Sequence, residues 1–328
     1  MKLSNRFQGL DALRSRGLEW VYIEQPTREK MDVVSKEYSL HELNIEDCLS
    51  KNQLPKIDRY EDHVFIILQF PTTQKQKTSP RFSQLSLFIG KDFLISIQHG
   101  DLKPLSEIFQ ACKMDNGKNK QNIMGSSPGY LLHSILDALV DDLLHILMKV
   151  IGNLDDIEDA VFDDKVAVAK EISMLRREIT TLRRIVVPLK RIMLEIISRD
   201  VKKFSTDVEA EDLISYFNDI NDHVSKVLEA LDESKETIEI YKDTDHMLSS
   251  EKTNKILSFL TILFTLSIPV TVVGTFYGMN INIPGSTNYS YNIIDFTPLI
   301  ITACFSIGSV IIMLYYFRKL GWLNNLTK

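Results

Sequence analysis

Amide, hydroxyl and large apolar side chains recur near the C-terminal end of the chain at the three- and four-residue steps of one helix face. They are Asn254, Leu257, Thr261, Phe264, Ile268, Thr271 and Thr275. Because unsatisfied polar groups in lipid are costly, such a stripe at membrane depth is typical of a face that lines a path for ions. The alternative is that each threonine hydroxyl only hydrogen-bonds a carbonyl of its own helix.

Two apolar segments, Ile256–Tyr277 and Phe296–Phe317, are each long enough to cross a hydrocarbon core of about 30 Å. No charged side chain occurs from residue 256 to residue 294. A buried core hairpin in a soluble protein is the alternative, but two segments of this length with a short loop between them are hard to bury. The sequence therefore predicts two transmembrane helices.

Basic residues flank the two segments on their outer sides. Lys252 and Lys255 precede the first, Arg318 and Lys319 follow the second, and the loop between has none. The positive-inside rule then predicts that both termini are cytoplasmic. Since the N-terminal residues have neither the apolar region of a signal peptide nor a transit peptide, we expect a multi-pass protein of the inner or plasma membrane.

The soluble part of the chain is acidic. All but one of the 44 acidic residues lie within residues 1–255, and all but three of the 38 basic ones. A nucleic-acid partner is not expected, because it needs clustered positive charge. The three cysteines, Cys48, Cys112 and Cys304, form no CxxC pair, which argues against a structural zinc site or a disulfide framework.

Residues 1–125 predict a mixed α/β domain. Its expected elements are a strand over 18–24, two helical pieces within 28–50, a strand over 63–70 ending at Pro71, a hairpin over 82–98 and a helix over 105–113, followed by a linker over 114–129.

Residues 126–255 predict a stalk of long helices. The apolar period indicates helices over 130–162, over 166–198 with a kink at Pro188, and from 209 without a break to 277, where the last would form a rigid rod.

Residues 256–328 then form a transmembrane hairpin, with spans over 256–277 and 296–317, a loop over 278–295 and a short cytoplasmic tail. Since one hairpin cannot enclose a channel, a path for ions requires several copies in a ring.

The first span ends in Tyr277-Gly278-Met279-Asn280, and here the sequence resembles the CorA family of magnesium channels. The Gly-Met-Asn tripeptide directly after a span, a short loop, a second span and the basic-aromatic tail over 316–323 together make the resemblance specific. Segments 41–49, 137–142 and 216–219 also look like family segments, so the resemblance covers the chain from about residue 15.

The resemblance implies a homopentamer in which the first spans line the pore. Asn280 would form a ring of side-chain carbonyls at the outer mouth that selects the ion, within the motif Gly278-Met279-Asn280. Asn254 matches the asparagine at the cytoplasmic end of the pore, and Thr271 matches a polar ring. A hydrophobic constriction would be formed by Leu257, Leu260 and Ile268.

These roles suit magnesium. Mg²⁺ dehydrates reluctantly, and a ring of neutral amide oxygens can hydrogen-bond a largely hydrated ion without holding it too tightly. A hydrophobic constriction can close by dewetting. None of these steps requires a catalytic group, so we expect no enzyme activity.

The resemblance also implies regulation by magnesium bound between neighbouring subunits, which holds the pentamer closed. Asp47 and Asp219 match the regulatory pair, and Glu46 and Asp137 match acids that support a second ion. The alternative is that these four are ordinary solvated acids on helix faces. One departure concerns the loop over 281–291, which has no acid where many relatives carry a glutamate, so capture of cations at the mouth is expected to be weaker.

The favoured function is a divalent-cation channel for magnesium influx, with cobalt and nickel as further ions. A zinc or other transition-metal transporter of the same fold remains open, although zinc relatives usually differ at the position of Met279. A second alternative is a membrane-anchored cytoplasmic sensor or enzyme, which the absence of a GxxxxGK[ST] or HExxH motif disfavours.

Overall fold

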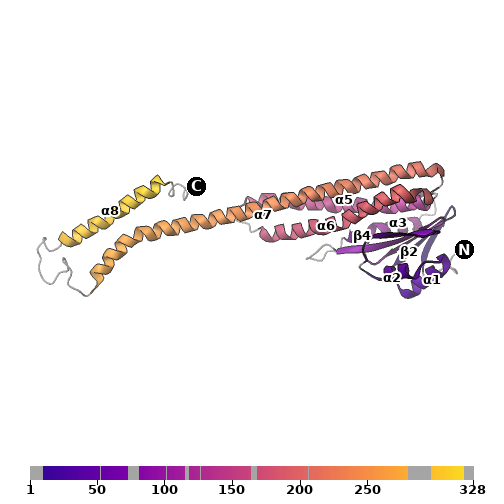
Figure 1. The fold of residues 1–328 in the computed structure, drawn as a ribbon, viewed down its shortest axis with the longest axis horizontal. Coiled ribbons are helices and arrows are strands. Elements are labelled where there is room, and N and C mark those ends of the chain that lie inside the picture. Colours follow the sequence, from indigo (N-terminus) through magenta and orange to yellow (C-terminus); the bar gives the residue numbers. More distant parts are fainter. Residues whose placement is uncertain are drawn as a thin grey trace. The chain divides into compact units, whose positions relative to one another are not determined.

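A computed structural model describes residues 10–51, 53–72, 81–100, 102–114, 118–125, 127–163, 168–205, 207–279 and 297–320. The chain divides into two compact units, residues 1–242 and 243–328 (Figure 1). The predicted domain limits at residues 125 and 255 remain predictions.

Unit 1 contains a six-stranded sheet in the order β1-β2-β6-β5-β4-β3. Its strands are β1 (Asp11–Ser15), β2 (Leu18–Glu24), β3 (Lys56–Arg59), β4 (His63–Thr72), β5 (Arg81–Gly90) and β6 (Phe93–Gln98). Neighbouring strands are antiparallel except β2 and β6, which are parallel. The predicted strand over 18–24 and the hairpin over 82–98 are confirmed, whereas β1 and β3 were not expected from the sequence.

The prediction that the strand from His63 ends at Pro71 was wrong. β4 continues through Pro71, which lies opposite Phe82 of β5, and ends at Thr72. Proline lacks only the backbone donor, and a strand can continue through it where the partner does not need that donor.

Helices α1 (Arg28–Tyr38) and α2 (Glu42–Leu49) cover one face of the sheet. Thr27 and His41 cap them, since each side chain accepts a hydrogen bond from a backbone N–H of the first turn. Both helices contribute side chains to one buried apolar cluster that also contains residues from β2, β4, β5 and β6. In Figure 1, α1 and α2 lie below the sheet, on the side away from the long helices.

The other face is covered by α3 (Lys103–Met114) and by the long helices. The ring of Phe109 on α3 packs edge-on against Trp20 at 5.0 Å and stacks on Tyr22 at 4.6 Å. Because both faces of the central strands are covered, β2 is buried along almost its whole length.

The expected linker over 114–129 is partly wrong, because it contains the short helix α4 (Lys118–Met124). The long helices that follow are α5 (Pro128–Val161), α6 (Ala169–Glu195) and α7 (Asp207–Gly278). α6 continues through Pro188 into a π-helical turn over Ile196–Asp200 and a 3₁₀ turn over Val201–Lys203.

Polar contacts join the three long helices within unit 1. From α6, Arg183 pairs with Asp232 of α7. From α7, the Tyr241 hydroxyl donates to Glu158 Oε2 of α5 at 2.6 Å. The α7 helix is thereby packed between residues of α5 and α6 over the part that belongs to unit 1.

Unit 2 contains the C-terminal part of α7 and the helix α8 (Thr297–Lys319). Both helices are long and apolar enough to cross a membrane. Thr302 Oγ1 of α8 lies 3.5 Å from the hydroxyl of Tyr277 on α7.

Candidate functional site: a polar stripe and an acidic face

The stripe expected to line a pore lies on one continuous helix, α7. Leu257 and Ile268 of the stripe are 54% and 56% exposed, Leu260 of the expected constriction is 39% exposed, and Asn254 and Thr271 are also exposed. Large apolar side chains exposed in a continuous patch mark a surface that contacts lipid or protein. The isolated chain therefore leaves this stripe open for other copies or for the membrane.

The threonine hydroxyls of the stripe are hydrogen-bonded within their own helix. Thr261 donates to Leu257 O at 2.7 Å, Thr271 to Ser267 O at 2.8 Å and Thr275 to Thr271 O at 2.7 Å. The alternative of bonding within the helix is therefore realised. It satisfies the hydroxyl proton, but each oxygen still has lone pairs that can accept a hydrogen bond from water.

The Gly-Met-Asn motif begins where α7 ends. Gly278 is the last residue of the helix, and the side chain of Met279 is 50% exposed. Asn280 and the loop over 281–291 lie outside the described residues. The structure therefore positions the start of the motif, and the role of Asn280 stays a prediction.

Two of the four acids expected to bind regulatory magnesium, Glu46 and Asp47, lie on α2. Asp47 is half-buried, and its Oδ2 lies 2.7 Å from Nζ of Lys56 on β3. The neighbouring Glu46 is exposed. Asp47 is thus paired within the chain with a lysine that the sequence analysis did not single out and that also pairs with Asp58.

The other two expected acids lie close to each other, on α5 and α7. Burial raises the pKa of the Asp137 carboxyl; the carboxylates of Asp141 and Asp219 raise it further, and His133 and His223 oppose the shift. Asp219 itself is exposed. The carboxylates of Asp137 and Asp219 are therefore close enough to repel each other electrostatically.

The two histidines of this cluster were missed. The Nδ1 atoms of His133 and His223 are buried without a hydrogen-bond partner among the described residues. Burial lowers the pKa of His133, although Asp137 and Asp219 oppose the shift. The signal in the sequence is the spacing, because each histidine stands four residues from one aspartate, on one helix face.

The four expected acids do not form one site in a single chain. None of the hydrogen bonds or ion pairs found between described residues joins Asp47 to Asp219. Among those residues, no group of three or more His, Cys, Asp or Glu side chains is arranged to hold a metal ion.

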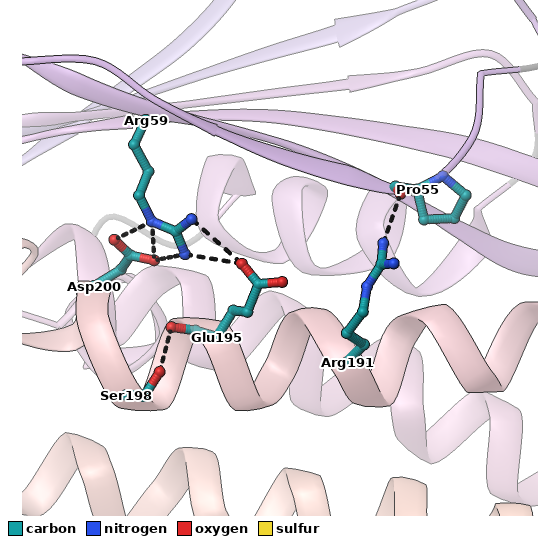
Figure 2. A network of polar contacts seen from close by, with 6 residues as sticks. All are labelled: Pro55, Arg59, Arg191, Glu195, Ser198 and Asp200. Atoms are coloured by element: carbon teal, nitrogen blue, oxygen red, sulfur yellow. Dashed lines mark hydrogen bonds and ion pairs between the residues drawn. The ribbon is translucent and has the colours of Figure 1, made fainter.

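A buried ion pair joins the sheet to the long helices. Arg59 of β3 donates to both carboxylate oxygens of Asp200, at 2.9–3.1 Å, and to Glu195 Oε2 at 3.2 Å (Figure 2). Asp200 ends the π-helical turn and is fully buried. Arg191 adds a second link, since it donates to Pro55 O at 3.4 Å.

A solved structure shows the same fold. "The complete structure of CorA magnesium transporter from Methanocaldococcus jannaschii" superposes with a TM-score of 0.73 at 18% identity, covering 95% of this chain and 93% of that one. An α/β domain and a long helix with an apolar C-terminal part, followed by a second apolar helix, are therefore the fold that this chain shares with a solved membrane transporter.

Sequence comparison shows the family. The model described as "CorA-like Mg2+ transporter protein" matches residues 15–319, and the chain therefore belongs to the CorA family of divalent-cation transporters. The cobalt/magnesium transport protein CorA of Thermotoga maritima is 28% identical over 88% of this chain and 79% of its own length. A more distant relative is the zinc transport protein ZntB of Yersinia pseudotuberculosis, 18% identical over 82% of this chain and 79% of its own length.

Proposed function

We propose that the protein is a homopentameric channel for magnesium influx, in which the α7 helices of five copies line the pore. The observation that carries the proposal is the exposed, uncharged stripe of α7, with amide and hydroxyl groups at helical spacing, in a chain of the CorA family. A single α7 exposes this stripe without enclosing a path, and a ring of copies would bring the stripes together around an axis.

Each level of the proposed pore has a distinct role in this channel. Asn254 at one end and Asn280 at the other present neutral amide oxygens, which hydrogen-bond a largely hydrated Mg²⁺ without stripping its water. Between them, Leu257, Leu260 and Ile268 narrow the path and close it by dewetting. The hydroxyl oxygen of Thr271 adds a polar ring between this constriction and the Gly-Met-Asn motif.

The channel is held closed by Mg²⁺ bound between subunits, with Asp47 of one copy and Asp219 of the next as ligands, supported by Glu46 and Asp137. Three features support this arrangement: Asp219 is exposed and Asp47 half-buried, the two carboxylates lie on different elements, and no hydrogen bond or ion pair between described residues joins them within one chain. Carboxylate oxygens are ligands that Mg²⁺ prefers. Without the cation, facing carboxylates repel and loosen the ring.

The topology follows from the flanking charges. Lys252 and Lys255 before the first span, and Arg318 and Lys319 after the second, place both termini in the cytoplasm. The regulatory acids are then in the cytoplasm, where the transported Mg²⁺ accumulates, so that the imported ion itself limits further influx.

Magnesium uptake into proteoliposomes tests the proposal, read by an entrapped magnesium-sensitive dye. The native protein is expected to pass Mg²⁺ down its gradient, and Asn280→Ala to lose selective uptake. A matched control is Asn288→Ala, an amide in the same loop that the proposal gives no role. Equal uptake by all three proteins would contradict the assignment of Asn280, and no uptake by the intact native oligomer would contradict the channel for magnesium.

A zinc or other transition-metal transporter is the second candidate, favoured by the relationship to ZntB. The resemblance to magnesium channels argues for magnesium over zinc, because zinc relatives usually differ at the position of Met279. Vesicles loaded with a zinc dye discriminate between the two, since faster zinc than magnesium uptake at equal gradients would support the second candidate.

A further inference from the structure

We propose that Lys56 is a tethered competitor of the regulatory cation, whose ammonium group occupies the Asp47 carboxylate in the cation-free subunit. The inference rests on the proposed role of Asp47 as a ligand of regulatory Mg²⁺. It assigns to this chain a residue that sets the cation concentration at which the channel closes.

The geometry places the ammonium between two carboxylates. Lys56 Nζ lies 2.7 Å from Asp47 Oδ2 and 2.6 Å from Asp58 Oδ2. The Asp47 side chain is 20% exposed, and those of Lys56 and Asp58 are each 37% exposed. The ammonium therefore holds a position at the Asp47 carboxylate that a cation arriving from solvent would need.

The sheet fixes this arrangement. Lys56 and Asp58 stand two residues apart on the edge strand β3, so their side chains lie on the same face. That face is the one that α2 covers, because Phe65, opposite Asp58 on β4, belongs to the core shared with α2. Lys56 Nζ also lies 5.5 Å from the centroid of the Phe65 ring.

The backbone that carries Asp47 is held independently of Lys56. Gln84 of β5 is buried, and its Nε2 donates to Asp47 O at 3.0 Å while its Oε1 accepts from Gln53 N at 3.1 Å. Replacing Lys56 therefore leaves both ends of the connection between α2 and β3 attached to the sheet. Loss of the lysine charge is the main change at Asp47.

Lys56 remains a cation over the physiological range. The ordinary pKa of lysine is about 10.4, and the carboxylates of Asp47 and Asp58 within ion-pair distance stabilise the charged form. A divalent cation at Asp47 must therefore displace a full positive charge. Asp58 gives the displaced ammonium a second partner, which lowers the cost of the exchange.

Two substitutions are therefore expected to shift cation binding in opposite directions. Lys56→Met removes the competing charge but keeps an unbranched apolar stem, so the midpoint of Mg²⁺ binding should fall about two- to fivefold, the range of a partly exposed ion pair. Asp58→Asn removes the second partner and leaves the ammonium on Asp47, so the midpoint should rise. Lys56→Arg keeps the charge and serves as the matched control.

The experiment is a Mg²⁺ titration of the thermal unfolding of the full-length oligomer in detergent, with intact assembly of each variant checked by size-exclusion chromatography. We expect Mg²⁺ to stabilise the native protein and Asp47→Asn to abolish this stabilisation. We also expect a lower Mg²⁺ midpoint in Lys56→Met and a higher one in Asp58→Asn. If Asp47→Asn abolishes the stabilisation but Lys56→Met does not change the midpoint, or if Lys56→Met and Asp58→Asn shift it in the same direction, the competitor role is overturned alone. Stabilisation that is insensitive to Asp47→Asn overturns the regulatory site together with the inference.

Discussion

The ion pair between Arg59 and Asp200 gives a stability prediction that depends on burial. Arg59→Met would leave the Asp200 carboxylate, whose side chain is 0% exposed, without its cationic partner. Removing one member of a buried ion pair costs about 3–5 kcal/mol. Because the Arg59 side chain is 25% exposed, water screens part of the interaction, and we expect the lower end, about 3 kcal/mol.

Thermal unfolding of the full-length protein, followed by circular dichroism, measures the effect. For a unit of about the size of residues 1–242, 1 kcal/mol corresponds to about 2–4 °C in Tm, so Arg59→Met should lower the Tm by about 6–12 °C. The matched control is Arg191→Met, because that exposed arginine donates only a long hydrogen bond to Pro55 O, and its loss should change the Tm by no more than about 4 °C.

A second substitution separates the unpaired charge from lost packing. Adding Asp200→Asn to Arg59→Met removes the buried charge, so the double variant should recover part of the lost Tm. If Arg59→Met unfolds within about 2 °C of the native protein, or if the double variant is less stable than Arg59→Met, the reasoning from buried charge is refuted.

Three further predictions concern regulation, the buried thiols and the β1–β2 turn. Asp219→Asn should weaken the inhibition of uptake by internal Mg²⁺ while selectivity is unchanged, and proteoliposomes loaded with graded Mg²⁺ would contradict the regulatory role if feedback stayed the same. Burial raises the pKa of Cys112 to about 11 and that of Cys48 to about 12, so both thiols stay protonated at pH 8. Mass spectrometry should therefore find both cysteines unmodified by iodoacetamide until the protein unfolds. Rapid labelling of either cysteine in the native protein would contradict this prediction. Gly17→Ala should cost about 1 kcal/mol, because Gly17 has φ +90°, and an unchanged Tm would refute the need for glycine there.

Local patterns in the sequence were sufficient for many of the elements. The short, mostly apolar segment of β2 and the two segments joined across Gly90 predicted a strand and a hairpin that the structure contains. The period of the long helices likewise predicted α7 to within two residues at its start and one at its end. In these segments the residues that determine the conformation lie within a few positions of one another.

The two strands that were missed differ in how far along the chain their partners lie. β3 is four residues long, with the polar sequence Lys-Ile-Asp-Arg, and it is held by Asp47 on one face and by Asp200, 141 residues further along the chain, on the other. β1 forms by pairing with β2 across Arg16 and Gly17, both at positive φ. The partners of β3 are therefore not visible in a local pattern, whereas β1 was missed although its partner β2 follows it directly in the sequence.

The candidate sites could likewise be predicted only in part from the sequence. The stripe on α7 could be predicted because it lies on one helix, and its exposure in the single chain agrees with a surface that faces lipid or other copies. The ion pair between Lys56 and Asp47 was missed because it depends on how the unpredicted strand β3 lies beside α2. The histidines beside Asp137 and Asp219 were missed although each stands four residues from one of these aspartates, because only the packing of α5 against α7 brings the two pairs together.

The central claim is that this stripe of α7 lines the conducting path, and cysteine accessibility during transport tests it most directly. In a background with Cys48, Cys112 and Cys304 replaced, Thr271→Cys places a thiol on the stripe, and Val270→Cys places one about 100° away on the same helix. The account predicts that a water-soluble thiol reagent blocks Mg²⁺ uptake through Thr271→Cys and leaves uptake through Val270→Cys unchanged. Block of Val270→Cys with no effect on Thr271→Cys would contradict it.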